Sequence, residues 1–286
     1  MNVPKPQAPD TLFRRARGEC GLASGTDLEH RLLAASAIAR EAGALARRRF
    51  RDRPSALAIA FKGPQDYVLA SDAEVEALIR LRLHEAFPED AFFGEEEGGA
   101  LGQSGQGAWV VDPIDGTANF ARGIPHYCVS LGFVRAGEAL IGVIYDPAHN
   151  QLYAAARGRG ATLDGEIIRV SGLGDIAQAT IEAGWSTRVP HEAYVGVVAR
   201  LKQAGAGVRR GGSGALALAY VAAGRMEAYV ELHMNAWDAL AGLVLVREAG
   251  GWVNDYLAGE GLTKGNAILA CTPELAEVLG ELTAVR

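Results

Sequence analysis

The sequence has few cysteines, no long apolar run and no strong excess of one charge sign, and each absence excludes a class of protein. The three cysteines, Cys20, Cys128 and Cys271, are odd in number and widely spaced, which disfavours a disulfide framework and a zinc site of CxxC type. No stretch of about 18 apolar residues occurs, so we expect no membrane-spanning helix. Lys and Arg total 28 and Asp and Glu 34, a net charge of −6 that disfavours a general nucleic-acid binder.

The amino-terminal segment carries no hydrophobic period. Residues 1–25 contain three prolines and no apolar stretch of signal-peptide type, so we expect a mobile leader and a cytoplasmic protein with reduced thiols. The whole chain has 286 residues, of which 49% are hydrophobic and 22% charged, as in folded globular proteins with a sizeable core.

Residues 26–170 predict two helices followed by a run of short strands. Capping-box patterns at 26–29 and 71–74 predict the helix starts, and Pro88 ends the second helix. Asp164-Gly165 predicts the turn of a hairpin over 162–170. Further strands are predicted at 91–94, 108–111, 127–134, 140–145 and 152–156.

Residues 171–286 alternate between helical and strand-like segments. Strands are predicted at 180–183, 226–232 and 267–271, and helices at 191–203, 213–223, 236–249 and from Thr272-Pro273 onward. This order favours an α+β fold in which an N-terminal α+β half, 26–170, is joined to a C-terminal α/β half, 171–286, with a seam near 170–178.

Several common catalytic motifs are missing from the sequence. It has no GxxxxGK[ST] phosphate loop, no GxGxxG after a strand and no HExxH, and the GGSGA run at 211–215 fails the GxSxG pattern. These absences disfavour P-loop, dinucleotide-dependent and zinc-dependent enzymes. Carboxylates, the hard oxygen ligands of Mg²⁺ and Ca²⁺, are the chemistry left to look for.

Carboxylates occur in unusual settings in three segments, FFGEEEG at 92–98, WVVDPIDGT at 109–117 and NAWD at 235–238. In the middle segment an apolar run predicts a buried strand with Asp112 at its carboxyl end. Pro113 would form the turn that brings Asp115 back toward Asp112, and two anions held together call for a divalent cation. Thr117 would cap a short helix whose free N–H groups suit a phosphate.

Each of these segments also has a reading without function. Asp112 and Asp115 could be solvated residues of a turn, the Glu95–Glu97 run could be an exposed charged stretch, and Asp238 could be a favourable charge at a helix start. On the residues alone both readings stay open.

Taken together, three blocks resemble the inositol monophosphatase family over most of the chain, from about Lys62 onward. The blocks are GEEEG at 94–98, WVVDPIDGTANFARGIPHYCVSLGF at 109–133 and WDALAGLVLVREAGG at 237–251. The resemblance implies a layered α/β/α/β/α sandwich with mixed sheets, a homodimer and a site that holds two or three Mg²⁺, with Mn²⁺ as a possible substitute. It also suggests inhibition by Li⁺.

The resemblance further implies roles for matching residues. Glu95, Asp112 and the Ile114 carbonyl would hold one Mg²⁺, and Asp112, Asp115 and Asp238 a second. Asp72 would orient Thr117, which with Glu95 would position the attacking water. The implied substrate contacts are Lys62, the N–H groups of Gly116 and Thr117, Gly214 and Glu231. The sequence departs from the family pattern at Ala118, at Gly214 and in the leader 1–25.

These features predict a Mg²⁺-dependent phosphomonoesterase that hydrolyses inositol 1-phosphate or a similar small polyol or sugar phosphate by direct transfer to water. One alternative is a fructose-1,6-bisphosphatase or histidinol-phosphate phosphatase, for which Arg188, Arg209 and Arg210 are candidate contacts to a second phosphate, although surface or interface roles fit them too. The other is a regulatory protein that uses this fold to bind a partner. We expect neither a nucleic-acid nor a membrane partner.

Overall fold

The computed structural model describes residues 25–53, 60–63, 66–68, 70–103 and 105–286. Within these ranges, side chains are described from residue 26 onward, except those of residues 60–68. The expectation of a leader therefore falls outside the described residues apart from Gly25. Cys20 and the side chain of Lys62 lie outside them as well.

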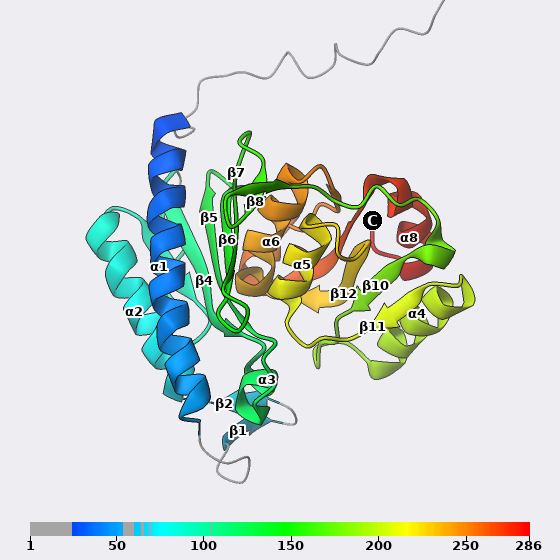
Figure 1. Cartoon of the computed structure of the whole chain (residues 1–286), viewed down its shortest axis with the longest axis horizontal. Coiled ribbons are helices and arrows are strands. Elements are labelled where there is room, and N and C mark those ends of the chain that lie inside the picture. Colours follow the sequence, from blue (N-terminus) through cyan, green and yellow to red (C-terminus); the bar gives the residue numbers. More distant parts are fainter. Residues whose placement is uncertain (1–24, 54–59, 64–65, 69, 104) are drawn as a thin grey trace, which may run out of the picture.

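The described residues form five layers in the order helices, sheet, helices, sheet, helices (Figure 1). One outer layer is α1 (Gly25–Arg51) and α2 (Ala70–Ala86), which cover a seven-stranded sheet. Two helices, α5 (Gly214–Ala222) and α6 (Ala236–Glu248), lie between the sheets, and α4 (His191–Gln203) and α8 (Ala276–Thr283) form the other outer layer. This arrangement confirms the α+β fold with a layered α/β/α/β/α sandwich.

The seven-stranded sheet contains the predicted meander in sequence order. Its strands are β3 (Ala91–Gly94), β4 (Gly107–Asp115), β5 (Cys128–Arg135), β6 (Glu138–Asp146), β7 (Gln151–Ala156), β8 (Ala161–Leu163) and β9 (Glu166–Ile168). Strands β3 and β4 are parallel and the other neighbours antiparallel, so the sheet is mixed. The hairpin turn is confirmed, since Asp164 and Gly165 both have positive φ, 52° and 90°.

The five-stranded sheet follows the order β11-β10-β12-β14-β13. Its strands are β10 (Thr180–Ala183), β11 (Gly207–Arg209), β12 (Ala228–Met234), β13 (Trp252–Val253) and β14 (Asn266–Cys271). Strands β10, β11 and β12 are parallel, whereas β14 pairs antiparallel with β12 and β13. Successive residues of β12 face opposite layers: Tyr229 packs with α5 and α6, and Val230 packs with α4 and α8.

Smaller elements complete the described residues. They are β1 (Ala60–Gly63), β2 (Asp66–Val68), α3 (Thr117–Arg122), α7 (Gly261–Lys264) and the 3₁₀ turns Ile176–Gln178 and Pro273–Leu275. In sequence, the strands of the seven-stranded sheet all precede residues 170–178 and those of the five-stranded sheet all follow them. The domain boundary proposed there remains a prediction. None of the helices in the described residues combines the length and apolar character needed to cross a bilayer.

The predicted helices are present: α1 begins at Gly25 and α2 at Ala70, each one residue before the predicted capping pattern. One local prediction was wrong. Strand β4 does not end at Val111 but runs on through Pro113 to Asp115. The pairing of β4 with β5 shifts register between Asp112 and Asp115, and such a bulge accommodates a proline that has no N–H to donate.

Candidate metal centre and adjoining cleft

Three aspartates from both halves of the chain meet in one place. Asp112, Asp115 and Asp238 each offer a carboxylate oxygen, and these oxygens all lie within 4.8 Å of one another. Asp112 and Asp115 stand at the end of β4, and Asp238 lies in the first turn of α6. We call these three residues the acidic cluster.

The bulge in β4 explains how two aspartates on one strand converge. In a regular strand residues i and i+3 point to opposite faces, so Asp112 and Asp115 would diverge. The register shift between them removes this alternation. The backbone N–H of Ile114 donates to Asp112 Oδ1 at 2.8 Å, which holds that side chain against the bulge. The predicted convergence is therefore present, but a bulge inside the strand produces it and not a turn after it.

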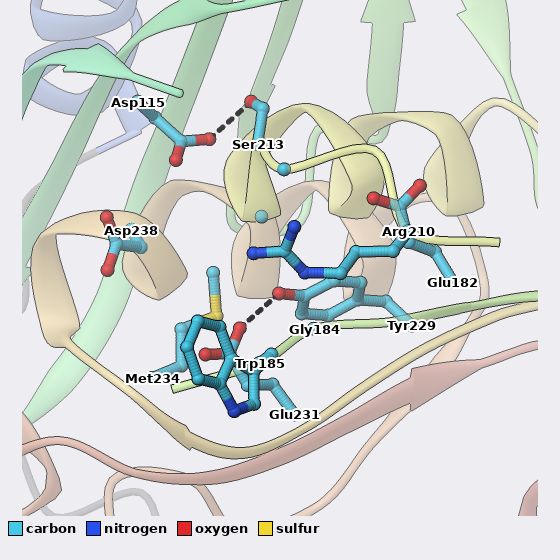
Figure 2. Close-up of a pocket in the computed structure, with 12 residues that line it drawn as sticks. Asp115, Glu182, Gly184, Trp185, Arg210, Ser213, Tyr229, Glu231, Met234 and Asp238 are labelled. Carbon is cyan, nitrogen blue, oxygen red and sulfur yellow. Dashed lines mark hydrogen bonds between the residues drawn. The ribbon is translucent and has the colours of Figure 1, made fainter. Parts of the chain in front are cut away.

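Asp115 is oriented by the second half of the chain. Its Oδ2 accepts a hydrogen bond from the Ser213 hydroxyl at 2.5 Å (Figure 2) and a second one from the Ala215 N–H at 2.8 Å. Ser213 and Ala215 stand at the start of α5. The Cys128 thiol also donates to Oδ2 at 3.7 Å, so several donors fix the direction of the Asp115 carboxylate.

The acidic cluster is electrostatically unfavourable without a cation. Burial raises the pKa of Asp112 well above its usual range, and the charges of Glu95 and Asp238 raise it further. Burial and the charge of Asp115 raise the pKa of Asp238 to about 7. Asp112 is only 1% exposed, so water cannot compensate its charge. Converging carboxylate oxygens, two from buried aspartates and one from the partly buried Asp238, fit a hard divalent cation, which would offset their repulsion.

Glu95 lies beside the acidic cluster at the end of β3. Its N–H donates to the Val111 carbonyl of β4 at 3.1 Å, which places it next to Asp112 along the sheet. Burial raises the pKa of Glu95 well above its usual range, and the charge of Asp238 adds to the rise. The structure thus brings all four predicted carboxylate ligands into one electrostatic group, although Glu95 is not one of the three whose oxygens lie within 4.8 Å.

Thr117 and Asp72 form a pair next to the cluster. Thr117 Oγ1 lies 3.2 Å from Asp72 Oδ1 and 3.1 Å from the Ile114 carbonyl oxygen. Burial raises the pKa of Asp72 to about 7. The predicted capping role of Thr117 was wrong: Gly116 is the N-cap of α3, with a left-handed φ of 98°, and a Cβ there would come within 3.0 Å of the His126 carbonyl oxygen.

A polar cavity adjoins the acidic cluster (Figure 2). Glu231, on β12, lines it, and its Oε2 accepts a hydrogen bond from the Tyr229 hydroxyl. Burial raises the pKa of Glu231 to about 8. Gly214 lines the same cavity, and a Cβ there would lie 2.7 Å from the Tyr229 hydroxyl and 2.6 Å from Met234 Cε. A side chain at this position would therefore collide with Tyr229 and Met234, and glycine avoids the collision.

The cavity opens into a wider cleft. Both are lined by Trp185, Arg210, Glu231, Met234 and Asp238, so they form one continuous space. The cleft has a volume of ≈ 730 Å³, which lies within the about 300–1,000 Å³ of small-molecule sites.

The three candidate arginines have different surroundings. The Arg210 guanidinium lies 5.6 Å from the centre of the Trp185 ring and lines the cleft, as Arg188 does. Arg209 pairs with the buried Glu182, with 3.2 Å between Nε and Oε2. The structure therefore places Arg188 and Arg210 at the cleft, whereas Arg209 pairs with Glu182, which lines the polar cavity.

Sequence reasoning missed Ser213, Tyr229 and Glu182 as parts of the site. Tyr229 precedes Glu231 by two residues on a predicted strand, and this spacing places both on one face. Ser213 directly precedes an apolar helical run, which marks a helix start. Glu182 carried no comparable signal: its Oε1 accepts the N–H of Gly211, which lies in the loop between β11 and α5, at 2.7 Å.

Comparison with known proteins agrees with this fold and site. The chain matches the inositol monophosphatase family over residues 27–284. It is 40% identical over 228 residues to an inositol-1-monophosphatase of Rhizobium meliloti (79% of this chain, 86% of the relative), and 36% identical over 243 residues to Nus factor SuhB of Escherichia coli K12 (84% and 91%). An inositol monophosphatase structure from Anabaena superposes with a TM-score of 0.79 at 32% identity, covering 91% of this chain and 97% of that one.

The fold and the carboxylate site are those of a metal-dependent phosphatase. The chain belongs to the inositol monophosphatase family.

Proposed function

We propose that this protein is a phosphomonoesterase that hydrolyses inositol 1-phosphate or a similar small polyol phosphate with the help of Mg²⁺. The observation that carries the proposal is the acidic cluster beside a polar cavity that adjoins a cleft of ≈ 730 Å³, the size of a small-molecule site. The identity to an inositol-1-monophosphatase supports the substrate class.

The carboxylates would hold the ions. Glu95, Asp112 and the Ile114 carbonyl would bind one Mg²⁺, and Asp112, Asp115 and Asp238 a second, with room for a third ion and for Mn²⁺ as a substitute. The bound ions would lower the pKa of a water molecule and neutralise charge on the phosphate. Since Asp115 Oδ2 is occupied by Ser213 and Ala215, we expect Oδ1 to face the ion.

The Thr117 hydroxyl would hold the attacking water. The hydroxyl can donate its single proton to Asp72 Oδ1 or to the Ile114 carbonyl oxygen. Because donation uses only the proton, the lone pairs of the Thr117 oxygen can accept a hydrogen bond from water. With Glu95 it would orient that water for direct attack on phosphorus, without a phosphoenzyme. Lys62 and the N–H groups of Gly116 and Thr117 would bind the phosphate.

The polyol would lie in the cavity next to the cluster. Glu231 is an acceptor for substrate hydroxyls, and the Tyr229 hydroxyl already holds one of its oxygens in place. Gly214 would approach the ring with its backbone. Arg210 lies at the opening of the cavity, and with Arg188 it is a candidate contact for a second phosphate, which keeps fructose 1,6-bisphosphate among the substrates to test.

Phosphate release across a panel of phosphomonoesters tests the proposal. We expect the highest kcat/KM with inositol 1-phosphate or a related polyol phosphate in Mg²⁺, retained activity in Mn²⁺, and none in EDTA. Fructose 1,6-bisphosphate and histidinol phosphate are the competing substrates. Metal-independent turnover, or no turnover of any member of the panel, would refute it.

A partner-binding role is a second candidate, because a relative at 36% identity is named a Nus factor. Capture of binding partners with an Asp238→Asn variant separates the two. A biological role that persists in this variant would favour binding, and one that disappears with turnover would favour catalysis.

A further inference from the structure

Helix α2 carries a second buried carboxylate, to which the proposed mechanism gives no role. Glu76 lies one helical turn after Asp72 and is 0% exposed. Its Oε2 accepts the N–H of Glu96 at 2.9 Å, and its Oε1 accepts the N–H of Glu97 at 3.0 Å. These two amides directly follow Glu95 in the chain. One buried carboxylate thus holds the backbone of the segment that presents a predicted metal ligand.

Arg80 completes the surroundings of Glu76. Its Nη2 lies 3.0 Å from Glu76 Oε1, and its guanidinium stacks 4.2 Å from the centre of the Phe92 ring. A buried anion is tolerated when a cation and several N–H donors surround it, and Glu76 has both. The arrangement therefore holds the Glu76 carboxylate rigidly in place.

The backbone around Glu95 is held from two sides. On one side the Glu95 N–H donates to the Val111 carbonyl of β4, which leads directly to Asp112. On the other side Glu76 holds the next two amides. The Glu76 carboxylate also packs against the residue before Glu95, because a Cβ at Gly94 would lie 2.4 Å from Glu76 Oε2. The position of the Glu95 side chain depends on both attachments.

We infer that Glu76 is a positioning residue that holds Glu95 at the acidic cluster and thereby strengthens binding of the divalent cation. This inference rests on the proposed function, since it assumes that Glu95 is a ligand. Groups that orient metal ligands typically change metal affinity or activity by about 10- to 100-fold when they are replaced. Glu76 would act in this way through the backbone of its neighbours.

The Glu76→Gln variant tests the inference with little change in shape. The Gln amide has only one oxygen that accepts hydrogen bonds. Its NH₂ group would face a backbone N–H and the Arg80 guanidinium, so the variant loses one hydrogen bond to the segment after Glu95 and the ion pair with Arg80. Glu74→Gln is the matched control, because Glu74 is on the same helix but is exposed and pairs with Arg49 at 2.5 Å.

Binding is measured directly by calorimetric titration of each metal-free protein with Mn²⁺, beside the Mg²⁺ dependence of phosphate release. We expect the Mn²⁺ dissociation constant and the half-saturating Mg²⁺ concentration to rise about tenfold or more in Glu76→Gln, with kcat partly restored at high Mg²⁺. Glu74→Gln should match the wild type. A Glu76→Gln variant that binds Mn²⁺ like the wild type, or an equal loss in Glu74→Gln, would overturn the inference.

A double-mutant cycle with Glu95→Gln shows whether Glu76 acts through Glu95. Once Glu95 is replaced, Glu76→Gln should weaken Mn²⁺ binding little further, whereas fully additive losses would contradict the inference. If Glu76→Gln does not fold, Arg80→Gln replaces it and should weaken Mn²⁺ binding in the same direction, and unchanged binding there would count against the inference. A wild-type protein that binds no Mn²⁺ would instead refute the proposed function itself.

Discussion

Replacing Asp238 by Asn should raise the stability of the metal-free protein while it abolishes turnover. Burial and the charge of Asp115 raise the pKa of Asp238 from 3.8 to about 7 in the folded chain. A difference of about 3 pKa units at 1.36 kcal/mol each corresponds to about 4 kcal/mol of destabilisation once Asp238 is ionised. Asn carries no charge and removes this cost. The same change removes a proposed ligand, and losing several kcal/mol of transition-state stabilisation lowers kcat by roughly a hundredfold or more.

The sign of the pH dependence follows from the direction of the shift. The folded-state pKa is raised, so the unfolded chain ionises first and the cost is fully present above pH about 7. It disappears as the pH falls toward the unfolded value of about 4. In EDTA, the stability difference between Asp238→Asn and the wild type should therefore be large at pH 8 and small near pH 4.

Thermal unfolding in EDTA and phosphate release in Mg²⁺ measure the two effects. At about 2–4 °C per kcal/mol, about 4 kcal/mol corresponds to an unfolding temperature roughly 8–16 °C above that of the wild type for the Asn variant at pH 8. Asp255→Asn, at an exposed position, is the control and should change neither quantity. Wild-type turnover in Asp238→Asn would refute the two-metal proposal, and an unchanged melting temperature at pH 8 would refute the electrostatic reasoning.

Three further predictions concern metals and substrate. Dialysis against EDTA should abolish phosphate release, and added Mg²⁺ should restore it. Mg²⁺ should also raise the melting temperature, because an ion that binds only the folded state stabilises that state. A melting temperature unaffected by Mg²⁺ would count against the metal site. LiCl should inhibit in a concentration-dependent way if Li⁺ occupies the second metal position, and activity that stays flat to high LiCl would argue otherwise. Glu231→Gln should raise KM for inositol 1-phosphate by roughly two- to tenfold, because Glu231 with a pKa of about 8 is mostly uncharged near pH 7 and a hydrogen bond between uncharged groups contributes about 0.5–1.5 kcal/mol. KM for p-nitrophenyl phosphate, which has no polyol hydroxyls, should stay almost unchanged. Equal effects on both substrates would exclude a hydroxyl contact.

The larger elements of the fold could be predicted from the sequence because each has a local signal. The Asp164-Gly165 turn, the apolar strands and the glycines that end α6 depend on neighbours a few residues away. The bulge in β4 could not be predicted, since it depends on how β4 pairs with β5. A proline after an apolar run favours the end of a strand, and only this pairing shows that the strand continues through Pro113 to Asp115.

In the acidic cluster, too, some contacts could be predicted from nearby residues and others depend on distant parts of the chain. Asp112 and Asp115 are close in sequence, so their convergence was accessible to local reasoning. Asp238 joined them only through the family resemblance, because the residue alone suited a helix start equally well. Ser213 and Glu76 were missed, since the bond from Ser213 to Asp115 joins residues 98 positions apart and the bonds of Glu76 reach amides 20 and 21 positions away. No local pattern encodes partners at that range.

The bond between Asp115 and the start of α5 has a consequence for biosynthesis. A ribosome releases the strand that carries Asp112 and Asp115 well before it releases Ser213 or Asp238. Until the later segments dock, the early aspartates have neither their orienting hydroxyl nor their third carboxylate. An unfinished chain would therefore bind a cation weakly, and the site would become active only after the complete chain has folded.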